Sequence, residues 1–407
     1  MTTSPDLDSR LYEIRVASHL DDRWAASFDG MSLVREPGGT TLLRGYLPDQ
    51  SALHGLLARL RDAGVPLLSV GAASAQSAAE MRAAVHHRFG EPEVVAIETI
   101  QRPEPAPGEL LIRVHATTVS AADHRARARD IPAGLLLPSS LVLGFVRPRR
   151  PVLGMDAAGV VVAVGPGETR VAVGGEVVAM LGSRFGGHAE YAIVDAAGAV
   201  AVKPPALSFE AAAALVFGGI TARAYLRQAD IRPGMRVLVN GASGAVGTAA
   251  VQLAHALGAR VTGVTSARNR DLVLSLGAER VIDHEAEDLA AGAERYDVIV
   301  DCVGNAPLAR VRDRLAPHGS LLLVAAGLRS LLSARRQARR EEIRIVTGPG
   351  RLRSEDLAHV MGLAEAGRVR PVIDRIFPFE QIADAHHLVD TGRKRGSVVV
   401  AVDVIPA

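Results

Sequence analysis

Cysteine is almost absent from this sequence. Cys302 is the single cysteine among 407 residues, so neither a disulfide framework nor a cysteine-rich zinc site can form. It lies in an apolar segment typical of a strand, and we expect a buried, unreactive thiol there. Nearly half of the chain is hydrophobic, which is enough for a large core, and its length is consistent with two or three domains.

An excess of one charge is also missing. The formal net charge is only +2, which argues against a nucleic-acid-binding stripe or an acidic tail. The N-terminus is polar and lacks the apolar region of a signal peptide. The uncharged stretch 131–146 is shorter than a membrane span and is interrupted by Pro132 and Pro138. We therefore expect a cytoplasmic protein with no nucleic-acid partner and no membrane partner.

Glycine is plentiful and is regularly spaced after one apolar segment. Residues 237–239 predict a buried strand, Gly241, Gly244 and Gly247 follow, and an apolar helical pattern then runs to Gly258. A strand, a glycine turn and a helix present backbone N–H groups to a pyrophosphate at the helix N-terminus. Ala242 stands where the first glycine of the usual fingerprint would be. The expected cofactor-binding residues of this turn are Gly241, Ala242, Ser243, Gly244, Ala245, Val246 and Gly247.

The next predicted strand, residues 260–265, ends without a carboxylate. A chain that binds NAD usually carries Asp or Glu there to hold the ribose 2′-hydroxyl. This chain carries Ser266, Arg268 and Asn269, whose hydroxyl, guanidinium and amide groups suit a 2′-phosphate. The pattern favours NADPH over NADH, although Arg268 on its own also fits an ordinary solvated arginine at a helix start.

Strands and helices continue to alternate after the glycine turn. Strands are predicted at residues 280–284, 297–303 and 320–325, and this alternation indicates a parallel, doubly wound α/β sheet. The segment at Val303 and the segment Ala325, Ala326 and Gly327 fall at strand ends. Ligands of such sheets bind at the carboxyl edge, so we expect these residues near the cofactor.

Residues 10–71 form a separate pattern. Strands, a hairpin and a helix started by Ser51 give the order β-α-β-β-α-β, with a first helix expected after Asp22. This order predicts a small α+β, ferredoxin-like domain, followed by a small-residue linker up to residue 77. No catalytic spacing occurs in it. It is either a docking or dimerisation module or a stabilising appendage.

Several ordered motifs then follow in the segments 119–125, 151–160, 185–191 and 203–205. With the glycine turn, they make the chain from residue 81 onward resemble the medium-chain dehydrogenase/reductase superfamily, in its zinc-free quinone reductase and enoyl reductase branch. The resemblance implies a GroES-like, β-rich catalytic domain with an inserted Rossmann domain. The expected boundaries are 1–76 for the accessory domain and linker, 77–206 for the first GroES-like part, 207–349 for the Rossmann domain and 350–407 for the second GroES-like part.

The resemblance also implies further site residues and an oligomeric state. It carries over six positions to the cofactor cleft: Thr221, Val246, Val303, Ala325, Ala326 and Arg395. Family members often associate through the edges of their Rossmann sheets, so we expect a homodimer.

Zinc is not expected. Zinc-dependent members carry Gly-His-Glu where this chain has Gly154, Met155 and Asp156, and the first-ligand cysteine and the four-cysteine lobe are missing. His115, His124 and His188 are conceivable substitutes, but structurally satisfied histidines are the simpler interpretation. Without a metal to stabilise an alkoxide, hydride transfer to a quinone or an α,β-unsaturated carbonyl compound is the favoured reaction.

Asp123 and Arg125 are the expected catalytic residues. Arg125 occupies the position where the branch often has Tyr or Lys, and it could polarise a carbonyl group but could not donate a proton at neutral pH. The alternative is a surface ion pair between the two residues. An apolar substrate pocket, or merely core, is expected from Leu135, Leu136, Leu137, Leu141, Leu143 and Phe145.

Two other functions stay open at this point. One is a zinc-free carbonyl or alcohol oxidoreductase. The other is an NADPH-binding regulatory or scaffold protein without turnover, in which residues 10–71 serve as the interaction module.

Overall fold

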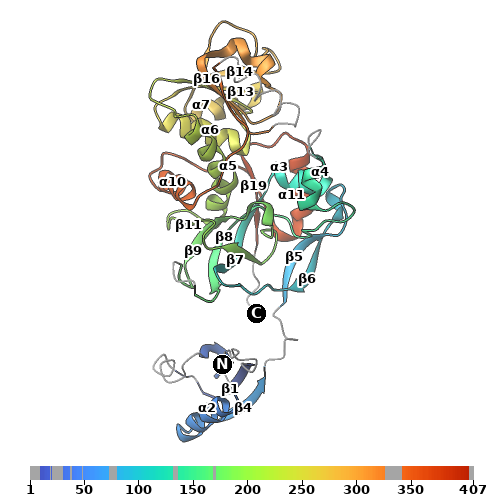
Figure 1. Ribbon diagram of the computed structural model, residues 1–407, viewed down its shortest axis with the longest axis vertical. Coiled ribbons are helices and arrows are strands. Elements are labelled where there is room, and N and C mark those ends of the chain that lie inside the picture. The colour runs from blue at the N-terminus through green and yellow to red at the C-terminus, as the bar shows by residue number, and fades with distance from the viewer. Residues whose placement is uncertain are drawn as a thin grey trace, which may run out of the picture. The chain divides into compact units, whose positions relative to one another are not determined.

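The structure of the protein is a computed structural model with two units, residues 1–79 and residues 80–407 (Figure 1). Each unit is described by itself. The described residues are 10–18, 20, 31–36, 39–47, 49–72, 80–131, 136–167, 171–325 and 342–402.

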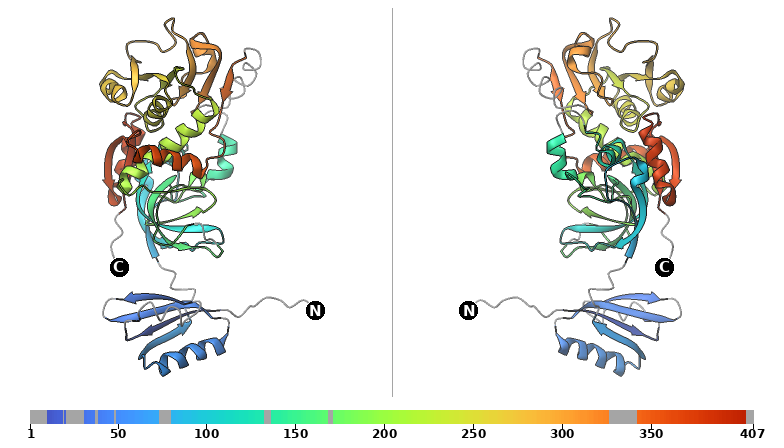
Figure 2. Two further views of the ribbon diagram at one scale, coloured as in Figure 1. Left: turned by 90° about the vertical axis from the view of Figure 1, so that its left-hand side faces the viewer. Right: turned by 90° about the vertical axis from the view of Figure 1, so that its right-hand side faces the viewer.

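The first unit contains one antiparallel sheet with the strand order β2-β3-β1-β4. Its elements are β1 (Arg10–Val16), β2 (Met31–Glu36), β3 (Thr40–Leu47), α2 (Gln50–Asp62) and β4 (Leu67–Ala72). Figure 2 shows α2 along one face of the sheet, where Leu53, Leu56 and Leu60 are buried. This strand order is that of a ferredoxin-like domain. The first predicted helix lies outside the described residues.

The start of α2 differs from the prediction. Asp49, not Ser51, is the N-cap residue, and its Oδ1 accepts a hydrogen bond from the Ala52 backbone N–H at 2.8 Å. The Ser51 hydroxyl donates to the same carboxylate at 2.5 Å. Both residue types cap helices well, so sequence preference alone could not separate them.

The second unit begins with a β-rich, GroES-like domain. Its main sheet has the order β11-β9-β8-β7-β19-β18, with β10 paired to β7, and β5 and β6 form a separate hairpin. Strand β19 pairs with β7, so the C-terminal part of the chain completes the domain that residues near 110 begin. The strands are β5 (Glu80–His86), β6 (Val95–Gln101), β7 (Glu109–Val119), β8 (Asp156–Val164), β9 (Glu176–Met180), β10 (Tyr191–Asp195), β11 (Ala199–Val202), β18 (Ile373–Pro378) and β19 (Ser397–Ala401).

Three helices accompany this domain: α3 (Ala121–Ala128), α4 (Leu136–Leu143) and α11 (Ile382–Asp390). Helix α4 lies inside the uncharged stretch 131–146. Leu136, Leu141 and Val142 on it are exposed. A continuous apolar run has no helical periodicity to reveal such a helix.

The inserted domain is a Rossmann fold with six parallel strands in the order β14-β13-β12-β15-β16-β17. The strands are β12 (Arg236–Asn240), β13 (Arg260–Thr265), β14 (Ala278–Asp283), β15 (Tyr296–Asp301), β16 (Leu315–Leu323) and β17 (Arg344–Val346). The helices beside them are α6 (Ala245–Ala256), α7 (Arg270–Ser275) and α8 (Leu308–Val311). Helix α5 (Phe209–Gln228) packs on α6, and α10 (Ser354–Glu365) packs on α5 and on β11. The α/β fold class expected from the sequence is therefore confirmed.

Helix α5 connects the two domains of this unit and lies between the barrel strands and the Rossmann helices (Figure 1). Among the described residues it alone is long and apolar enough to cross a membrane, but 72% of its apolar window is buried inside the protein. Ala213, Val216 and Ile220 are among its fully or almost fully buried residues.

Candidate active site

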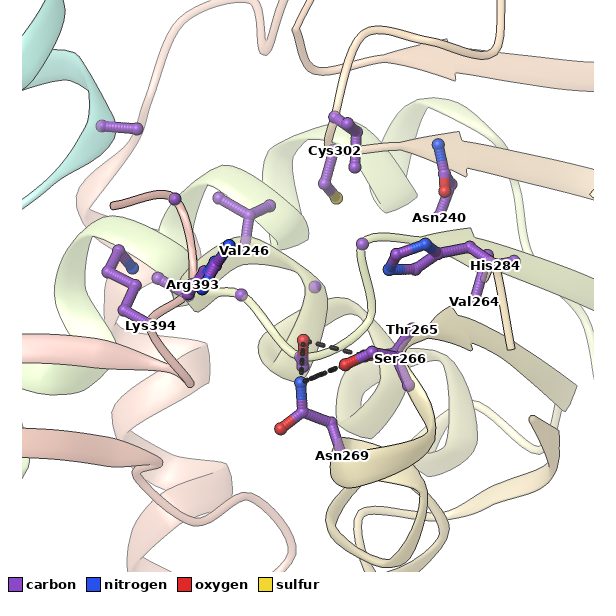
Figure 3. Close-up of a pocket in the computed structure, with 18 of the residues that line it drawn as sticks. Asn240, Val246, Val264, Thr265, Ser266, Asn269, His284, Cys302, Arg393 and Lys394 are labelled. Atoms are coloured by element: carbon purple, nitrogen blue, oxygen red, sulfur yellow. Dashed lines mark hydrogen bonds between the residues drawn. The ribbon is translucent and has the colours of Figure 1, made fainter. Parts of the chain in front are cut away.

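A cavity of about 500 Å³ lies in the second unit. It lies at the carboxyl ends of β12, β13 and β15, where parallel sheets bind ligands. Its opposite wall is the end of β7 and the start of α3, from Thr118 to Ala121. The cavity thus lies between the Rossmann domain and the β-rich domain, and Figure 3 shows part of its lining.

The glycine turn forms the floor of this cavity. Gly241 has φ +78°, a conformation that side chains rarely adopt. A Cβ atom on Gly247 would lie 2.0 Å from the Gly241 carbonyl oxygen, so helix α6 can approach the turn only without a side chain there. Gly244 is the N-cap of α6 and makes no side-chain cap bond. The first N–H groups of α6 therefore stay available for an anion.

A hydroxyl and amide cluster stands beside the turn at the end of β13. The Thr265 hydroxyl donates to the Ser243 hydroxyl at 2.9 Å, and the Asn269 amide nitrogen donates to Ser243 at 3.2 Å and to Ser266 at 3.3 Å (Figure 3). Asn269 Oδ1 is buried without a partner in the described structure. Ser266, Arg268 and Asn269 all line the cavity, which is the group that the sequence pattern assigned to a 2′-phosphate.

A basic segment crosses the turn from the C-terminal part of the chain. The Gly396 N–H donates to the Ser243 carbonyl at 2.7 Å, and Arg393 and Lys394 line the cavity. Arg268 donates to the Arg393 carbonyl at 3.4 Å. These bonds place three cationic side chains around the N-terminus of α6, where anions are already favoured by the helix dipole.

Lys394 is the most unusual of these cations because it is partly buried. Its Nζ donates to the Gly396 carbonyl at 2.6 Å. Burial lowers the pKa of Lys394 to about 8, and the negative charge of Asp374 opposes this change. A buried ammonium group is costly without a counterion, so the site favours a ligand that supplies negative charge.

A buried carboxylate holds the third wall of the cavity in place. Asp301 accepts hydrogen bonds from the Gly304 N–H at 2.9 Å, the Ala306 N–H at 2.9 Å and the Asn240 side chain at 2.8 Å. These bonds order the segment after β15, from which Cys302, Val303 and Asn305 line the cavity. Cys302 is half-buried rather than fully buried as expected from the sequence, and desolvation raises the pKa of its thiol, which lowers its reactivity.

Two hydroxyl and carboxylate pairs form the wall from the β-rich domain. Ser120 is the N-cap of α3, and its hydroxyl donates to Asp123 Oδ2 at 2.6 Å. The Thr118 hydroxyl donates to Asp156 Oδ2 at 2.5 Å, and the Thr118 N–H donates to Asp156 Oδ1 at 2.7 Å. Thr118 and Ser120 line the cavity, whereas both carboxylates are fully buried behind it.

Ten of the expected cofactor-binding residues line this cavity: Gly241, Ser243, Gly244, Ala245, Val246, Gly247, Ser266, Arg268, Asn269 and Val303. Ala242 is fully buried against Gly263 instead. Thr221 and Ala325 are buried outside the lining. Arg395 is also outside it, with its backbone N–H bonded to Asp374. Ala326 and Gly327 lie outside the described residues.

The two expected catalytic residues do not lie together. Asp123 is fully buried and accepts hydrogen bonds from the Ser120 and Gly154 backbone N–H groups at 2.8 and 2.9 Å. The alternative of a surface pair with Arg125 is therefore wrong. Arg125 lines a second, more open cavity of about 420 Å³. A role of either residue in the chemistry stays a prediction.

The second cavity contains only part of the expected apolar pocket. Leu143 lines it together with Val142, Met155 and Phe185. Leu136, Leu141 and Phe145 are 47–61% exposed. Leu135 and the side chain of Leu137 lie outside what the structure describes.

The donor groups do not suit zinc. His124 Nδ1 contacts Asp390 at 2.6 Å, His188 Nε2 contacts the Thr118 carbonyl at 3.1 Å, and the His115 ring stacks on Phe209. Over the described ranges, no three His, Cys, Asp or Glu side chains come close enough to share a metal ion. A catalytic zinc needs three such protein ligands.

Among the lining residues that sequence reasoning missed are Thr118, Arg393 and Lys394, and it also missed Asp156 behind the lining. Thr118 stands at the end of an apolar strand and gave no motif. Asp156 was considered only as a departure from a zinc motif. The basic run 393–395 was visible, but its path across the glycine turn depends on the pairing of β19 with β7.

Three family models match the chain. A model described as the alcohol dehydrogenase GroES-like domain matches residues 106–205, and one described as zinc-binding dehydrogenase matches residues 276–400. A model described only as a domain of unknown function matches residues 11–71.

Curated relatives and solved structures extend these matches. The chloroplastic quinone-oxidoreductase of Triphysaria versicolor is 31% identical over 73% of this chain and 91% of its own length. The NADPH-dependent alkenal/one oxidoreductase of Arabidopsis thaliana is 31% identical over 79% of each chain. The structure of the quinone oxidoreductase from Coxiella burnetii has a TM-score of 0.71 at 28% identity and covers 80% of this chain and 100% of its own.

Proposed function

Because the chain belongs to the medium-chain dehydrogenase/reductase superfamily, in its quinone oxidoreductase-like branch, we propose that it is an NADPH-dependent reductase. It transfers hydride to a quinone or to an α,β-unsaturated carbonyl compound. The observation that carries this proposal is the group of Ser266, Arg268 and Asn269 at the end of β13, which lines the cavity. No carboxylate stands among them at the strand end, although Glu287 and Asp288 line the cavity farther along the chain.

The residues present fit a dinucleotide. The open N-terminus of α6 and the bare face of Gly244 suit a pyrophosphate. Arg268 suits the 2′-phosphate, because within the described structure its partner is a neutral carbonyl rather than a carboxylate. Lys394 and Arg393 add positive charge beside the turn. The nicotinamide cofactor, when bound, supplies the hydride.

The wall of the β-rich domain supports the proposed acceptor class. Thr118 and Ser120 line that wall, and no group of metal ligands occurs among the described residues. Reduction of a quinone or an enone places negative charge on a carbonyl oxygen, which hydrogen-bond donors can stabilise. Relatives named as quinone oxidoreductases and as an alkenal/one oxidoreductase support the same class.

The first test is the oxidation of NADPH and of NADH at 340 nm against a panel of quinones, enones and simple aldehydes, with a chelator present. Chelator-resistant turnover of quinones or enones with preference for NADPH is expected. Turnover of aldehydes alone would indicate a carbonyl oxidoreductase instead. Tight NADPH binding without turnover of any acceptor would indicate a regulatory or scaffold protein.

Cofactor preference has a sharper test in Arg268→Ala. A charge-assisted hydrogen bond contributes roughly 1.5–3 kcal/mol, so the KM for NADPH should rise about 10- to 100-fold while the KM for NADH stays unchanged. Arg260→Ala is the matched control, because Arg260 is an exposed arginine of the same domain that pairs with Glu279 outside the cavity. An equal loss for both cofactors would contradict binding of the 2′-phosphate.

A homodimer and a cytoplasmic location are part of the same proposal. Light scattering after size-exclusion chromatography should give twice the mass of the 42.7 kDa chain. A monomeric mass would contradict the proposed dimer but would not bear on the proposed reaction.

A further inference from the structure

We propose that the Asp156 carboxyl group and the Thr118 hydroxyl group form a two-member proton relay that protonates the reduced substrate in the cavity. The proposal rests on the proposed function and adds the proton donor to it. Arg125 cannot take this role, because a guanidinium does not release its proton at neutral pH and because Arg125 lines another cavity.

The geometry joins a buried acid to the cavity through one hydroxyl group. Asp156 is fully buried at the start of β8 and does not line the cavity. Its Oδ2 lies 2.5 Å from the hydroxyl oxygen of Thr118, which does line the cavity. Across the described part of the chain, this is the single hydrogen bond of the Thr118 hydroxyl. One donor or acceptor direction of that hydroxyl therefore stays available to a bound substrate.

The neighbouring pair of Ser120 and Asp123 is not equivalent. The Ser120 hydroxyl donates to Asp123 at 2.6 Å and also accepts from the Ala122 and Asp123 backbone N–H groups at 3.2 and 3.3 Å. The hydrogen-bonding capacity of the Ser120 hydroxyl is therefore used in capping α3. Asp123 holds two backbone N–H groups as well. The Ser120–Asp123 pair therefore has a structural role, whereas the Thr118 hydroxyl can still make another hydrogen bond.

The surroundings of Asp156 favour its protonated form. Burial raises the pKa of Asp156 to about 7, hydrogen bonds from Thr118 oppose the change, and the negative charge of Asp123 adds to it. His188 is the other titratable group nearby, on the segment before β10, and burial lowers its pKa so that it brings no positive charge at neutral pH. Asp156 therefore holds a proton that it can exchange near neutral pH.

The direction of the short hydrogen bond then decides where the proton goes. When Asp156 is protonated, its O–H donates to Thr118 Oγ1, and the hydrogen of the Thr118 hydroxyl is free to donate to a substrate oxygen. As hydride reaches the substrate, that oxygen gains a negative charge and takes the Thr118 proton. The O–H bond of Asp156 breaks at the same time and restores the hydroxyl of Thr118. The Asp156 carboxylate recovers a proton from water through Thr118 after the product leaves.

Four variants separate the relay from a structural effect. Thr118→Val and Asp156→Asn interrupt it, and Thr118→Ser keeps the hydroxyl group. Thr117→Val is the matched control, since the Thr117 hydroxyl also contacts Asp156, at 2.8 Å to the carbonyl and 3.3 Å to Oδ1, but does not line the cavity. General acid catalysis contributes about 10²–10⁴-fold. We expect kcat to fall roughly 100-fold in the two interrupted variants, with the KM for NADPH unchanged.

The pH profile distinguishes proton donation from packing. In the wild type kcat should fall as pH rises through about 7, because the acid must be protonated. This fall should be present in Thr118→Ser and Thr117→Val and absent in Asp156→Asn. A solvent deuterium isotope effect on kcat should disappear in the same variant.

Infrared difference spectra of the full-length protein without substrate give an independent readout. A band of a buried protonated carboxyl group should titrate near neutral pH in the wild type and in Thr117→Val, and it should be missing in Asp156→Asn. Its absence in the wild type would overturn the relay. So would full activity of Thr118→Val, or an equal loss in Thr117→Val. If the wild type reduces no acceptor at all, the proposed function fails and the relay fails with it.

Discussion

The two walls of the cavity are built in different ways. The Rossmann wall consists of the glycine turn, the end of β13 and the segment after β15, all within one continuous domain. The wall of the β-rich domain joins the end of β7 to Asp156 on β8 and to the segment near Gly396, which are far apart in the chain. The first wall follows from local backbone geometry. The second exists only after strands from both ends of the domain have paired.

The difference between the two walls shows where local sequence patterns are sufficient to predict a site. A turn that needs a positive φ at Gly241 and no side chain at Gly247 has almost no alternative sequence. A threonine and an aspartate that are far apart in the sequence give no sign that they will be buried next to each other. Perturbing each wall in turn tests whether the Rossmann wall binds and the other wall reacts.

The largest effect is expected from Gly247→Ala in the Rossmann wall. Its Cβ would lie 2.0 Å from the Gly241 carbonyl oxygen, so the turn or α6 must move. Backbone strain of this kind places the cost among the exceptional cases, at about 4 kcal/mol or more. Thermal unfolding and NADPH binding by fluorescence should both show the loss. Gly362→Ala in α10, where a Cβ meets nothing within 4 Å, should be neutral or slightly stabilising.

Asp156→Asn should change the pH dependence of stability. Because the folded-state pKa of Asp156 is about 7 and its ordinary value is 3.8, the folded protein binds the extra proton. The stability that this proton contributes is complete below pH 4 and is lost as pH rises to about 7. At 1.36 kcal/mol per pKa unit the loss is on the order of 4 kcal/mol as an upper limit.

Urea unfolding of the wild type and of Asp156→Asn at pH 4.5 to 8 measures this loss. The asparagine variant should gain stability relative to the wild type as pH rises. If the free energy of unfolding changes with pH in the same way in both proteins, Asp156 does not titrate in this range. Asp156 could then not serve as the acid in the proposed reaction.

Lys394→Met should weaken cofactor binding without altering the chemistry. A partly buried ammonium group that bonds a pyrophosphate contributes roughly 1.5–3 kcal/mol, so the Kd for NADPH should rise about 10- to 100-fold with kcat unchanged. The wild-type affinity should fall as pH rises above about 8, where Lys394 loses its proton, and the variant should lack this dependence. Isothermal titration calorimetry at several pH values measures both. A pH-independent wild-type affinity would place the cofactor away from Lys394.

The smallest effect on cofactor affinity is expected from Arg125→Ala. Arg125 lines the second cavity, so the Kd for NADPH should change less than about twofold, within the range of surface substitutions. Steady-state kinetics with quinones and enones then examines its expected catalytic role. A large fall in kcat would show that the second cavity takes part in the reaction and that both cavities receive substrate.

The Rossmann domain could be predicted well because its signals are local. The expected strands at residues 260–265 and 280–284 agree with β13 (Arg260–Thr265) and β14 (Ala278–Asp283) to within two residues. The end of β13 was also predicted to carry the phosphate-binding side chains, and these line the cavity. Parallel strands place their carboxyl ends on one edge, so position in the sequence was enough.

The wall of the β-rich domain could not be predicted, and the reasons for this are also physical. Thr118 becomes a site residue only because β8 pairs with β7 and brings Asp156 beside it. Asp123 was predicted to be catalytic from the resemblance; in the structure it is buried and accepts backbone N–H groups, and a role in the chemistry stays a prediction. Helix α4 carries too few polar residues for its helical period to be visible.

By itself, the sequence determined the α/β class, the glycine turn, the lack of a carboxylate at the end of β13 and the absence of the family's zinc ligands, because each depends on residue types at fixed local spacing. Only the tertiary structure decided that Thr118 lines the cavity, that Asp156 is buried behind it and that Lys394 is partly buried in its lining. Burial, charge neighbours and hydrogen-bond partners come from chain segments that pair over long distances, and these set the pKa values on which the chemistry depends.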